Sequence, residues 1–129
     1  MKFLLDTHIW LWSLEESERL GPRVRSELKN PENEFWLSPI SCWEALLLNR
    51  KGRIDLPADV DSLLTLAISN LHEAPLTHEI VLAANNLPLR HHDPADRFLA
   101  ATAGVLGLTL ITADEHLLGL GEIATLANR

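Results

Sequence analysis

The sequence predicts an α/β protein whose central parallel sheet, of four or five strands, is covered by helices on both faces. Short apolar runs alternate with helical segments along the whole chain, which is typical of βαβ units. A length of 129 residues with 47% hydrophobic content suits one domain with a substantial core, so we expect residues 1–129 to form a single domain. No internal repeat or linker interrupts this pattern.

Five apolar or β-branched runs are the candidate strands. The first is uninterrupted from Phe3 to Leu5, and such runs suit parallel strands that are buried on both faces. The third contains Pro75, which favours a sheet edge or a strand end because proline has no N–H to donate. In chain order, the expected strands are residues 2–5, 34–37, 72–76, 108–112 and 123–126.

Helices are expected between these strands, where a turn or a capping residue precedes apolar residues at helical spacing. Gly21-Pro22 breaks the chain before one helix, and Ser38-Pro39 and Asp93-Pro94 each supply an N-cap followed by a first-turn proline. Another helix should begin after Asp6 or Thr7, either of which can cap it. The others are expected at residues 22–30, 38–48, 59–70, 77–84, 93–103 and 116–120.

The composition limits the compartment in which this chain works. Its single cysteine, Cys42, lies in an apolar stretch, which excludes a disulfide framework within the chain and suits a reducing cytosol. The N-terminal apolar run is too short for the core of a signal peptide, and no run is long enough to span a bilayer. We therefore expect a cytoplasmic protein without a membrane partner.

The formal net charge of −7 argues against a protein that holds nucleic acid by neutralising phosphates alone. Two features weaken this argument: divalent cations can neutralise acids gathered in one pocket, and basic residues form two groups. One group is Arg50, Lys51 and Arg53, and the other is Arg90 and Arg97. Either group can also be a solvated rim, which is the commoner meaning of clustered charge.

Four acids that are far apart in the sequence should lie at one edge of the sheet. Asp6 and Asp114 each follow a buried strand, while Glu44 and Asp96 lie in the first turns of helices. The carboxyl ends of parallel strands meet at the edge where open α/β sheets bind ligands. Crowded carboxylates repel one another, and a hard divalent cation such as Mg²⁺ or Mn²⁺ removes that repulsion most simply. Such an ion could activate a water for attack on a phosphodiester.

Helix capping is the structural alternative for several of these acids. Asp6 can cap the next helix, and Asp93 is a good N-cap for the helix that begins at Pro94. Asp96 in the same first turn can complete a capping box. Asp93 could also serve as a fifth, outer acid of the proposed site.

Ion pairing is the alternative for Glu44 and Arg97. Glu44 is the only residue in the apolar stretch 40–48 that is charged at neutral pH, so its carboxylate needs a base or a metal ion beside it. An ion pair with Arg50 or Arg53 would meet that need. Arg97 could contact a phosphate, although a salt bridge to a neighbouring carboxylate is the favoured expectation.

Hydroxyl and imidazole groups also lie near the four acids. Thr7 and Thr112 could orient a carboxylate or a water by hydrogen bonding, or could simply cap a helix and pack in a strand. His8, His91 and His92 are weak candidates for substrate contact, because a metal-bound water removes the need for a histidine base.

The four tryptophans are expected to divide between core and surface. Trp10 and Trp12 are two residues apart, so on a helix they point in different directions, and at least one should lie near a surface used by a partner. Core packing is expected for Trp36 and Trp43.

Four segments of the chain resemble, in order and spacing, the acidic motifs of PIN-domain ribonucleases, in particular the VapC-type toxins of type II toxin-antitoxin pairs. They are Lys2-Phe3-Leu4-Leu5-Asp6-Thr7-His8, Ser41-Cys42-Trp43-Glu44, residues 92–103 and Leu110-Ile111-Thr112-Ala113-Asp114. The resemblance implies a three-layer α/β/α PIN fold, Mg²⁺-dependent cleavage of RNA, a homodimer and inhibition by a cognate antitoxin. It also implies that Asp6, Glu44, Asp96 and Asp114 are the metal-binding acids.

Other protein classes place acids at the same edge of a parallel sheet. A phosphoacceptor receiver domain would have an adjacent acid pair after the first strand and a lysine after the last strand, and both are missing here. A haloacid-dehalogenase-type phosphatase would have an acid two residues after Asp6, where His8 stands. The remaining alternative is a catalytically inactive module whose acids cap helices and bind a basic partner. An inhibitor that offers an arginine would also suit the pocket, because guanidinium binds carboxylates bidentately.

Overall fold

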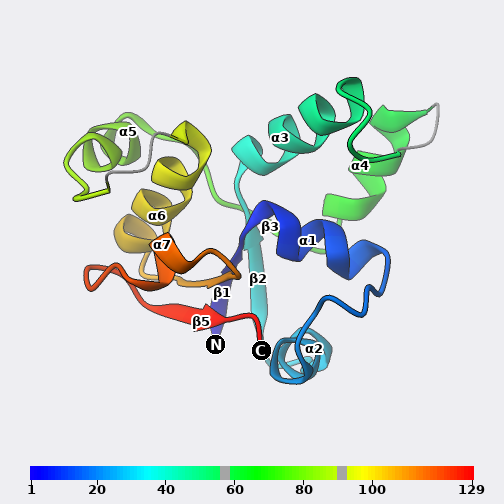
Figure 1. Cartoon of the computed structure of the whole chain (residues 1–129), viewed down its shortest axis with the longest axis horizontal. Coiled ribbons are helices and arrows are strands. Elements are labelled where there is room, and N and C mark those ends of the chain that lie inside the picture. The colour runs from blue at the N-terminus through cyan, green and yellow to red at the C-terminus, as the bar shows by residue number, and fades with distance from the viewer. Residues whose placement is uncertain (56–58, 90–92) are drawn as a thin grey trace.

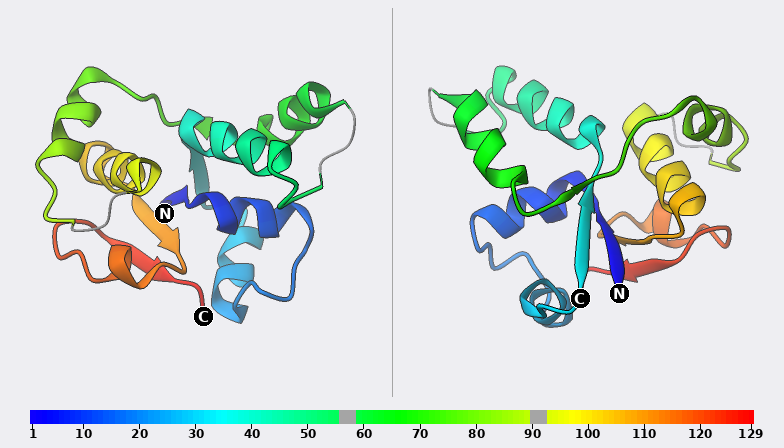
Figure 2. Two further views of the ribbon diagram at one scale, coloured as in Figure 1. Left: turned by 45° about the horizontal axis from the view of Figure 1, so that its top comes forward. Right: turned by 180° about the vertical axis from the view of Figure 1, so that it is seen from behind.

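The computed structural model describes residues 1–55, 59–89 and 93–129. At its centre is a sheet of five parallel strands in the order β3-β2-β1-β4-β5, with helices on both faces (Figure 1 and Figure 2). The strands are β1 (Lys2–Leu5), β2 (Glu34–Leu37), β3 (His72–Glu73), β4 (Thr109–Thr112) and β5 (Thr125–Ala127). The predicted α/β class is therefore confirmed, with five strands.

The helices begin at or near the predicted capping residues. Ser38 accepts a hydrogen bond from the N–H of Ile40 at 3.2 Å, and Thr77 accepts one from the N–H of Ile80 at 3.2 Å. The helices are α1 (Thr7–Leu14), α2 (Pro22–Lys29), α3 (Pro39–Arg50), α4 (Val60–Ile68), α5 (His78–Asn85), α6 (Pro94–Leu106) and α7 (Glu115–Leu118). Within the described ranges, no helix has the length and apolar character needed to cross a membrane.

The sheet separates two hydrophobic cores, and β1 contributes to both. Phe3 and Leu5 pack with residues of α1, α2, α3 and α4 on one face. Leu4 points to the opposite face and packs with residues of α6 and α7. Successive side chains of a strand alternate between faces, so an uninterrupted apolar run is what a strand covered on both sides requires. Figure 2 shows the two groups of helices on either side of the sheet.

The third strand is shorter than the sequence predicts. Pairing with β2 ends at Glu73, and one further backbone bond joins the N–H of Ala74 to the carbonyl of Leu37 at 3.0 Å. The next residue, Pro75, has no N–H to donate, so the ladder cannot continue through it.

The expected core position of Trp43 is wrong, because 48% of this residue is exposed. The positions of α3 that face the core are Ser41 and Ala45, which are both fully buried. Residues two apart on a helix point in nearly opposite directions, so Trp43 is turned outward. Trp36 is partly buried against the second core. Trp10 is buried and Trp12 is half-buried, so these two side chains differ in exposure, as their spacing on a helix predicts.

We predict that Gly107→Ala lowers the free energy of unfolding by about 1 kcal/mol. Gly107 ends α6 in the left-handed conformation, with φ of 67°, which is unfavourable for a residue with a Cβ atom. Urea denaturation measures the change. Gly121→Ala is the matched control, because open space surrounds Gly121 and its φ is not left-handed. Equal effects of the two substitutions would contradict the prediction.

Candidate active site

The central strands end at a place where the order of the sheet reverses. β1 lies between β2, which follows it in the chain, and β4, which comes much later. In parallel α/β sheets, ligands bind beyond the carboxyl ends of the strands at such a point. Asp6 directly follows β1, Thr112 ends β4, and Figure 1 shows the first turns of α3 and α6 near this same end of the strands.

The carboxylate of Asp6 is held between two parallel strands. Only 9% of this residue is exposed. Its Oδ2 accepts a hydrogen bond from the hydroxyl of Thr112 at 2.6 Å, and its Oδ1 accepts one from the N–H of Thr7 at 2.7 Å. The Thr112 hydroxyl in turn accepts the N–H of Asp114 at 3.0 Å. Thr112 therefore links Asp6 to Asp114 through one hydroxyl group.

The capping roles expected for Asp6 and Asp93 are present, and Asp114 has one as well. Asp93 accepts the N–H of Ala95 at 3.0 Å at the start of α6, and Asp114 accepts the N–H of His116 at 2.8 Å at the start of α7. Each of the three acids uses Oδ1 for its cap. Because a carboxylate oxygen has more than one acceptor site, capping leaves each acid able to bind a cation as well.

Glu44 is fixed by α1 rather than by an arginine. The hydroxyl of Thr7 donates a short hydrogen bond to Oε1 of Glu44 and lies 2.9 Å from the hydroxyl of Ser41. Arg50 instead places its guanidinium over the ring of Trp43, 5.6 Å from the centroid. In the part of the chain that the structure describes, no ion pair joins Glu44 to an arginine, so the ion-pair alternative is wrong.

Ser41 is a site residue that the sequence analysis did not single out. It is fully buried and lies three residues before Glu44, so both side chains share one side of α3. Its contact with the hydroxyl of Thr7 joins α3 to α1. The sequence could have indicated this role, because a small polar residue stands three positions before an acid in a mostly apolar helix.

Asp96 lies in the first turn of α6 and is 9% exposed. Helix α6 packs against α3, and the charge of Asp93 in its cap acts on Glu44. The acids of α6 thus lie on the side of the molecule that α3 faces. The convergence of Asp96 itself with Asp6 and Asp114 stays a prediction.

The acids at this edge act on one another electrostatically. Burial is the main cause that raises the pKa of Asp6, and the charge of Asp114 raises it further, while the bonds from Thr112 and Thr7 oppose the shift. Burial also raises the pKa of Glu44, with added repulsion from Asp93 and Asp6. The exposed His8 lowers both pKa values, by more than Asp114 raises that of Asp6 but by less than Asp93 and Asp6 raise that of Glu44. The net effect is an excess of negative charge that a cation would relieve.

The predicted ligands of the site are oxygen donors, which suit some metal ions better than others. Over residues 1–55, 59–89 and 93–129, no three acid, histidine or cysteine side chains lie close enough together to hold a metal ion by themselves. Zinc sites usually need three or four such protein ligands. Magnesium keeps several waters and binds through one or two carboxylates together with substrate phosphates. Carboxylates that lie within electrostatic reach, without histidine or cysteine among the predicted ligands, therefore fit Mg²⁺ or Mn²⁺ better than zinc.

Among the described residues Arg97 forms no salt bridge to a carboxylate, so that expectation is wrong, and its contact with a phosphate stays a prediction. Its guanidinium donates hydrogen bonds to the carbonyls of Ala84, at 2.8 Å, and Leu87, at 3.3 Å, and to that of Leu89. Ala84 lies in the last turn of α5, while Leu87 and Leu89 follow the helix, so this side chain ties the end of α5 and the segment after it to α6. The expectations for Arg90, His91 and His92 lie outside the described residues.

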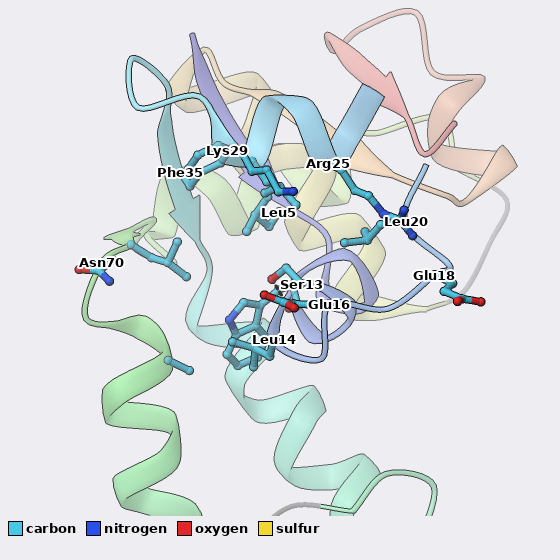
Figure 3. Close-up of a pocket in the computed structure, with 14 residues that line it drawn as sticks. Leu5, Ser13, Leu14, Glu16, Glu18, Leu20, Arg25, Lys29, Phe35 and Asn70 are labelled. Carbon is cyan, nitrogen blue, oxygen red and sulfur yellow. Dashed lines mark hydrogen bonds between the residues drawn. The ribbon is translucent and has the colours of Figure 1, made fainter. Parts of the chain in front are cut away.

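Two cavities lie beside α1 and away from the acids. The larger, about 560 Å³, is bounded by β1, α1, α2, β2 and the end of α4, and Figure 3 shows Leu14 and Phe35 among its lining residues. The second, about 480 Å³, lies between α1 and α4. Both are lined by Leu14, Ala67 and Asn70, so together they form one groove, which we call the α1–α4 groove. None of the four predicted acids lines it.

Known proteins share this sequence pattern and fold. The family model described as PIN domain matches residues 3–123. Ribonuclease VapC22 of Mycobacterium tuberculosis is 31% identical over 115 residues, which is 88% of each chain. The crystal structure of VapBC2 from Rickettsia felis bound to a promoter DNA fragment superposes with a TM-score of 0.73 at 16% identity and 98% coverage of both chains. DNA-bound VapBC from Salmonella typhimurium gives 0.71 at 19% identity, covering 100% of this chain and 99% of that one.

We predict that the metal-free protein becomes less stable as the pH rises above about 4. The raised pKa values of Asp6 and Glu44 mean that the folded chain binds protons there more tightly than the unfolded chain. Their contribution to stability is therefore complete below the unfolded pKa values and is lost as the pH rises through the folded ones.

Urea denaturation in EDTA at a series of pH values measures this dependence. Asp6→Asn and Glu44→Gln should each flatten it. Asp61→Asn, which removes one exposed acid from the first turn of α4, is the control and should keep the wild-type slope. If the free energy of unfolding depends on pH equally in the wild type and in the Asp6→Asn/Glu44→Gln double variant, the prediction is wrong.

Proposed function

The chain belongs to the PIN-domain family, among its VapC-type ribonucleases, and we propose that it is a Mg²⁺- or Mn²⁺-dependent endoribonuclease, the toxin of a type II toxin-antitoxin pair. Asp6, Glu44, Asp96 and Asp114 would hold the metal. The observation that carries the proposal is the pair of hydrogen-bonded links, Asp6–Thr112–Asp114 and Thr7–Glu44, at the carboxyl edge of β1 and β4.

The proposed chemistry needs carboxylates whose positions are fixed before substrate binds. When bound, the metal ion lowers the pKa of a coordinated water and neutralises charge on the phosphate. Thr112 orients Asp6 and Thr7 orients Glu44, so neither side chain has to give up rotational freedom when the ion arrives. Asp93 would act as an outer acid that adds to the negative field at Glu44.

A catalytically inactive module that binds a basic partner is the second candidate. The caps made by Asp6, Asp93 and Asp114 favour it, since they give each of these acids a structural role that needs no metal. The two candidates differ over Glu44, which caps no helix and is nevertheless held half-buried beside Asp6. Burying an acid without an opposite charge is costly, so this placement favours the metal-dependent enzyme.

A cognate antitoxin is the proposed protein partner. Solved structures with this fold include VapBC complexes from Rickettsia felis and Salmonella typhimurium. The α1–α4 groove would receive an apolar segment of the antitoxin, because its lining is rich in leucine and exposes Leu14 and Leu66. We further propose, from the family resemblance, that residues 1–129 act as one domain, in a cytoplasmic homodimer.

We predict that Asp6→Asn, Glu44→Gln, Asp96→Asn and Asp114→Asn each lower the rate of RNA cleavage by roughly 100-fold or more, because each removes a charge that holds the metal ion. Single-turnover cleavage in Mg²⁺ measures the rate, and calorimetric titration with Mn²⁺ measures ion binding. Asp61→Asn is the control with the same charge change. Full cleavage by any two of the four variants would remove the site, and unchanged Mn²⁺ binding would favour the inactive module.

We predict that Leu66→Asp weakens antitoxin binding by about tenfold or more and leaves RNA cleavage unchanged, because it places a charge in an apolar interface. Leu66 is 73% exposed in the α1–α4 groove. Leu82→Asp is the matched control, since Leu82 is 67% exposed on α5, away from the groove. Titration calorimetry with the purified antitoxin measures affinity. Equal losses for the two variants would show that the groove is not the docking site.

A further inference from the structure

We propose that the exposed side of α3 guides single-stranded RNA to the acids, with Trp43 stacking on a base and Arg50, Lys51 and Arg53 contacting phosphates. The inference rests on the proposed function and adds the conformation of the substrate and the surface that holds it. The acid site does not explain two properties of α3 and the segment directly after it, which are an exposed tryptophan and a group of exposed cations.

Trp43 presents a large aromatic surface to solvent. It is 48% exposed, and the guanidinium of Arg50 lies over its ring at 5.6 Å from the centroid. The two residues are seven apart, which is two helical turns, so they lie on the same side of α3. An aromatic face beside an arginine is the combination that holds unpaired bases in proteins that bind single strands.

The same helix carries an acid of the proposed site. Glu44 follows Trp43 directly, and Arg50 stands about 10 Å further along the axis at 1.5 Å per residue. Ile40, one turn before Trp43 and Glu44, packs in the core on the α6 side of the sheet. The stripe that runs from Ile40 through Trp43 to Arg50 therefore starts at the end of α3 that packs toward α6, passes next to Glu44 in sequence, and leads away from it.

The cations at the end of α3 are available to an anionic ligand. Arg50, Lys51 and Arg53 are all exposed. Within residues 1–55, 59–89 and 93–129, none of the three forms an ion pair with an acid. The chain carries a net charge of −7, so a polyanion needs a local basic surface to approach four carboxylates. This group lies at the C-terminal end of α3, the helix that holds Glu44, and continues into the segment that follows it.

The aromatic contact selects single strands over duplexes. A base can stack on Trp43 only if it is free of its own stack, whereas a duplex offers phosphates and 2′-hydroxyls but keeps its bases paired. The three cations alone would accept either form. Trp43 therefore supplies the preference for an unpaired segment, and the cations supply affinity that depends on salt.

The test measures the affinity of the full-length protein for a fluorescein-labelled oligouridylate in EDTA, so that binding is separated from cleavage. Trp43→Ala should raise Kd by about tenfold, and Trp43→Phe, which keeps an aromatic face, by less than about threefold. Arg50→Gln should reduce the slope of log K against log salt by about 0.7, and Lys51→Gln/Arg53→Gln by about 1.4. Trp43→Ala should leave this slope largely unchanged.

Arg23→Gln is the matched control for charge. Arg23 is exposed on α2, which lies at the opposite end of the molecule from α3 (Figure 1 and Figure 2), so its loss should leave the salt slope unchanged. In Mg²⁺, Trp43→Ala should raise KM for single-stranded RNA and keep kcat, because the acids are untouched. Affinity for a duplex of the same length should change by less than about twofold.

Two results would overturn the inference while leaving the proposed nuclease intact. One is a Kd for Trp43→Ala within about twofold of the wild type. The other is a slope of log K against log salt that stays at the wild-type value in Arg50→Gln and in Lys51→Gln/Arg53→Gln. Light scattering gives a further outcome. If Trp43→Ala has a lower molecular mass than the wild type but an unchanged affinity for RNA, the inference is also overturned, and this side of α3 is assigned to contact with a second copy of the chain. If the variants behave as expected but Asp6→Asn still cleaves RNA, the catalytic proposal fails and the binding surface stands.

Discussion

The buried carboxylate of Asp6 is the constraint on which the site depends. A charged group in this position is unfavourable unless hydrogen bonds compensate for its lost hydration. The hydroxyl of Thr112 and the N–H of Thr7 provide part of that compensation, yet the pKa of Asp6 remains raised. The folded chain therefore keeps an incompletely compensated carboxylate at the edge where β1 and β4 meet, and this lowers its stability. A divalent cation bound there, as we propose, would offset this cost.

Helix capping and the proposed metal binding are compatible uses of the same residues. Asp6, Asp93 and Asp114 each cap a helix through one oxygen, and the cap fixes the direction of the remaining lone pairs. Helix N-termini also carry partial positive charge, which stabilises carboxylates that would otherwise repel one another. An acid placed between a strand and a helix is thus stabilised by the N-terminus of that helix, and neighbouring carboxylates are held near one another without a bound ion.

The sequence predicts the parts of this structure that depend on local chemistry. Continuous apolar runs and capping residues identify the strands and helix starts, and the acids that follow β1 and β4 could be placed at one edge from topology alone. Partners chosen by tertiary packing are less predictable. Arg97 satisfies carbonyls at the end of α5, and Trp43 faces solvent because Ser41 and Ala45 take the buried side of α3. No local pattern fixes which of several neighbours a long side chain will reach.

The position of β1 in the centre of the sheet links the site to the order of synthesis. Asp6 directly follows β1, and its hydroxyl partner, Thr112, comes 106 residues later. A prematurely terminated chain contains the first acid but has neither β4 nor the threonine that orients it. A chain that stops before β4 therefore has no complete link between Asp6 and Thr112. Assembly of this edge waits until most of the domain has been synthesised, which delays any activity that depends on it.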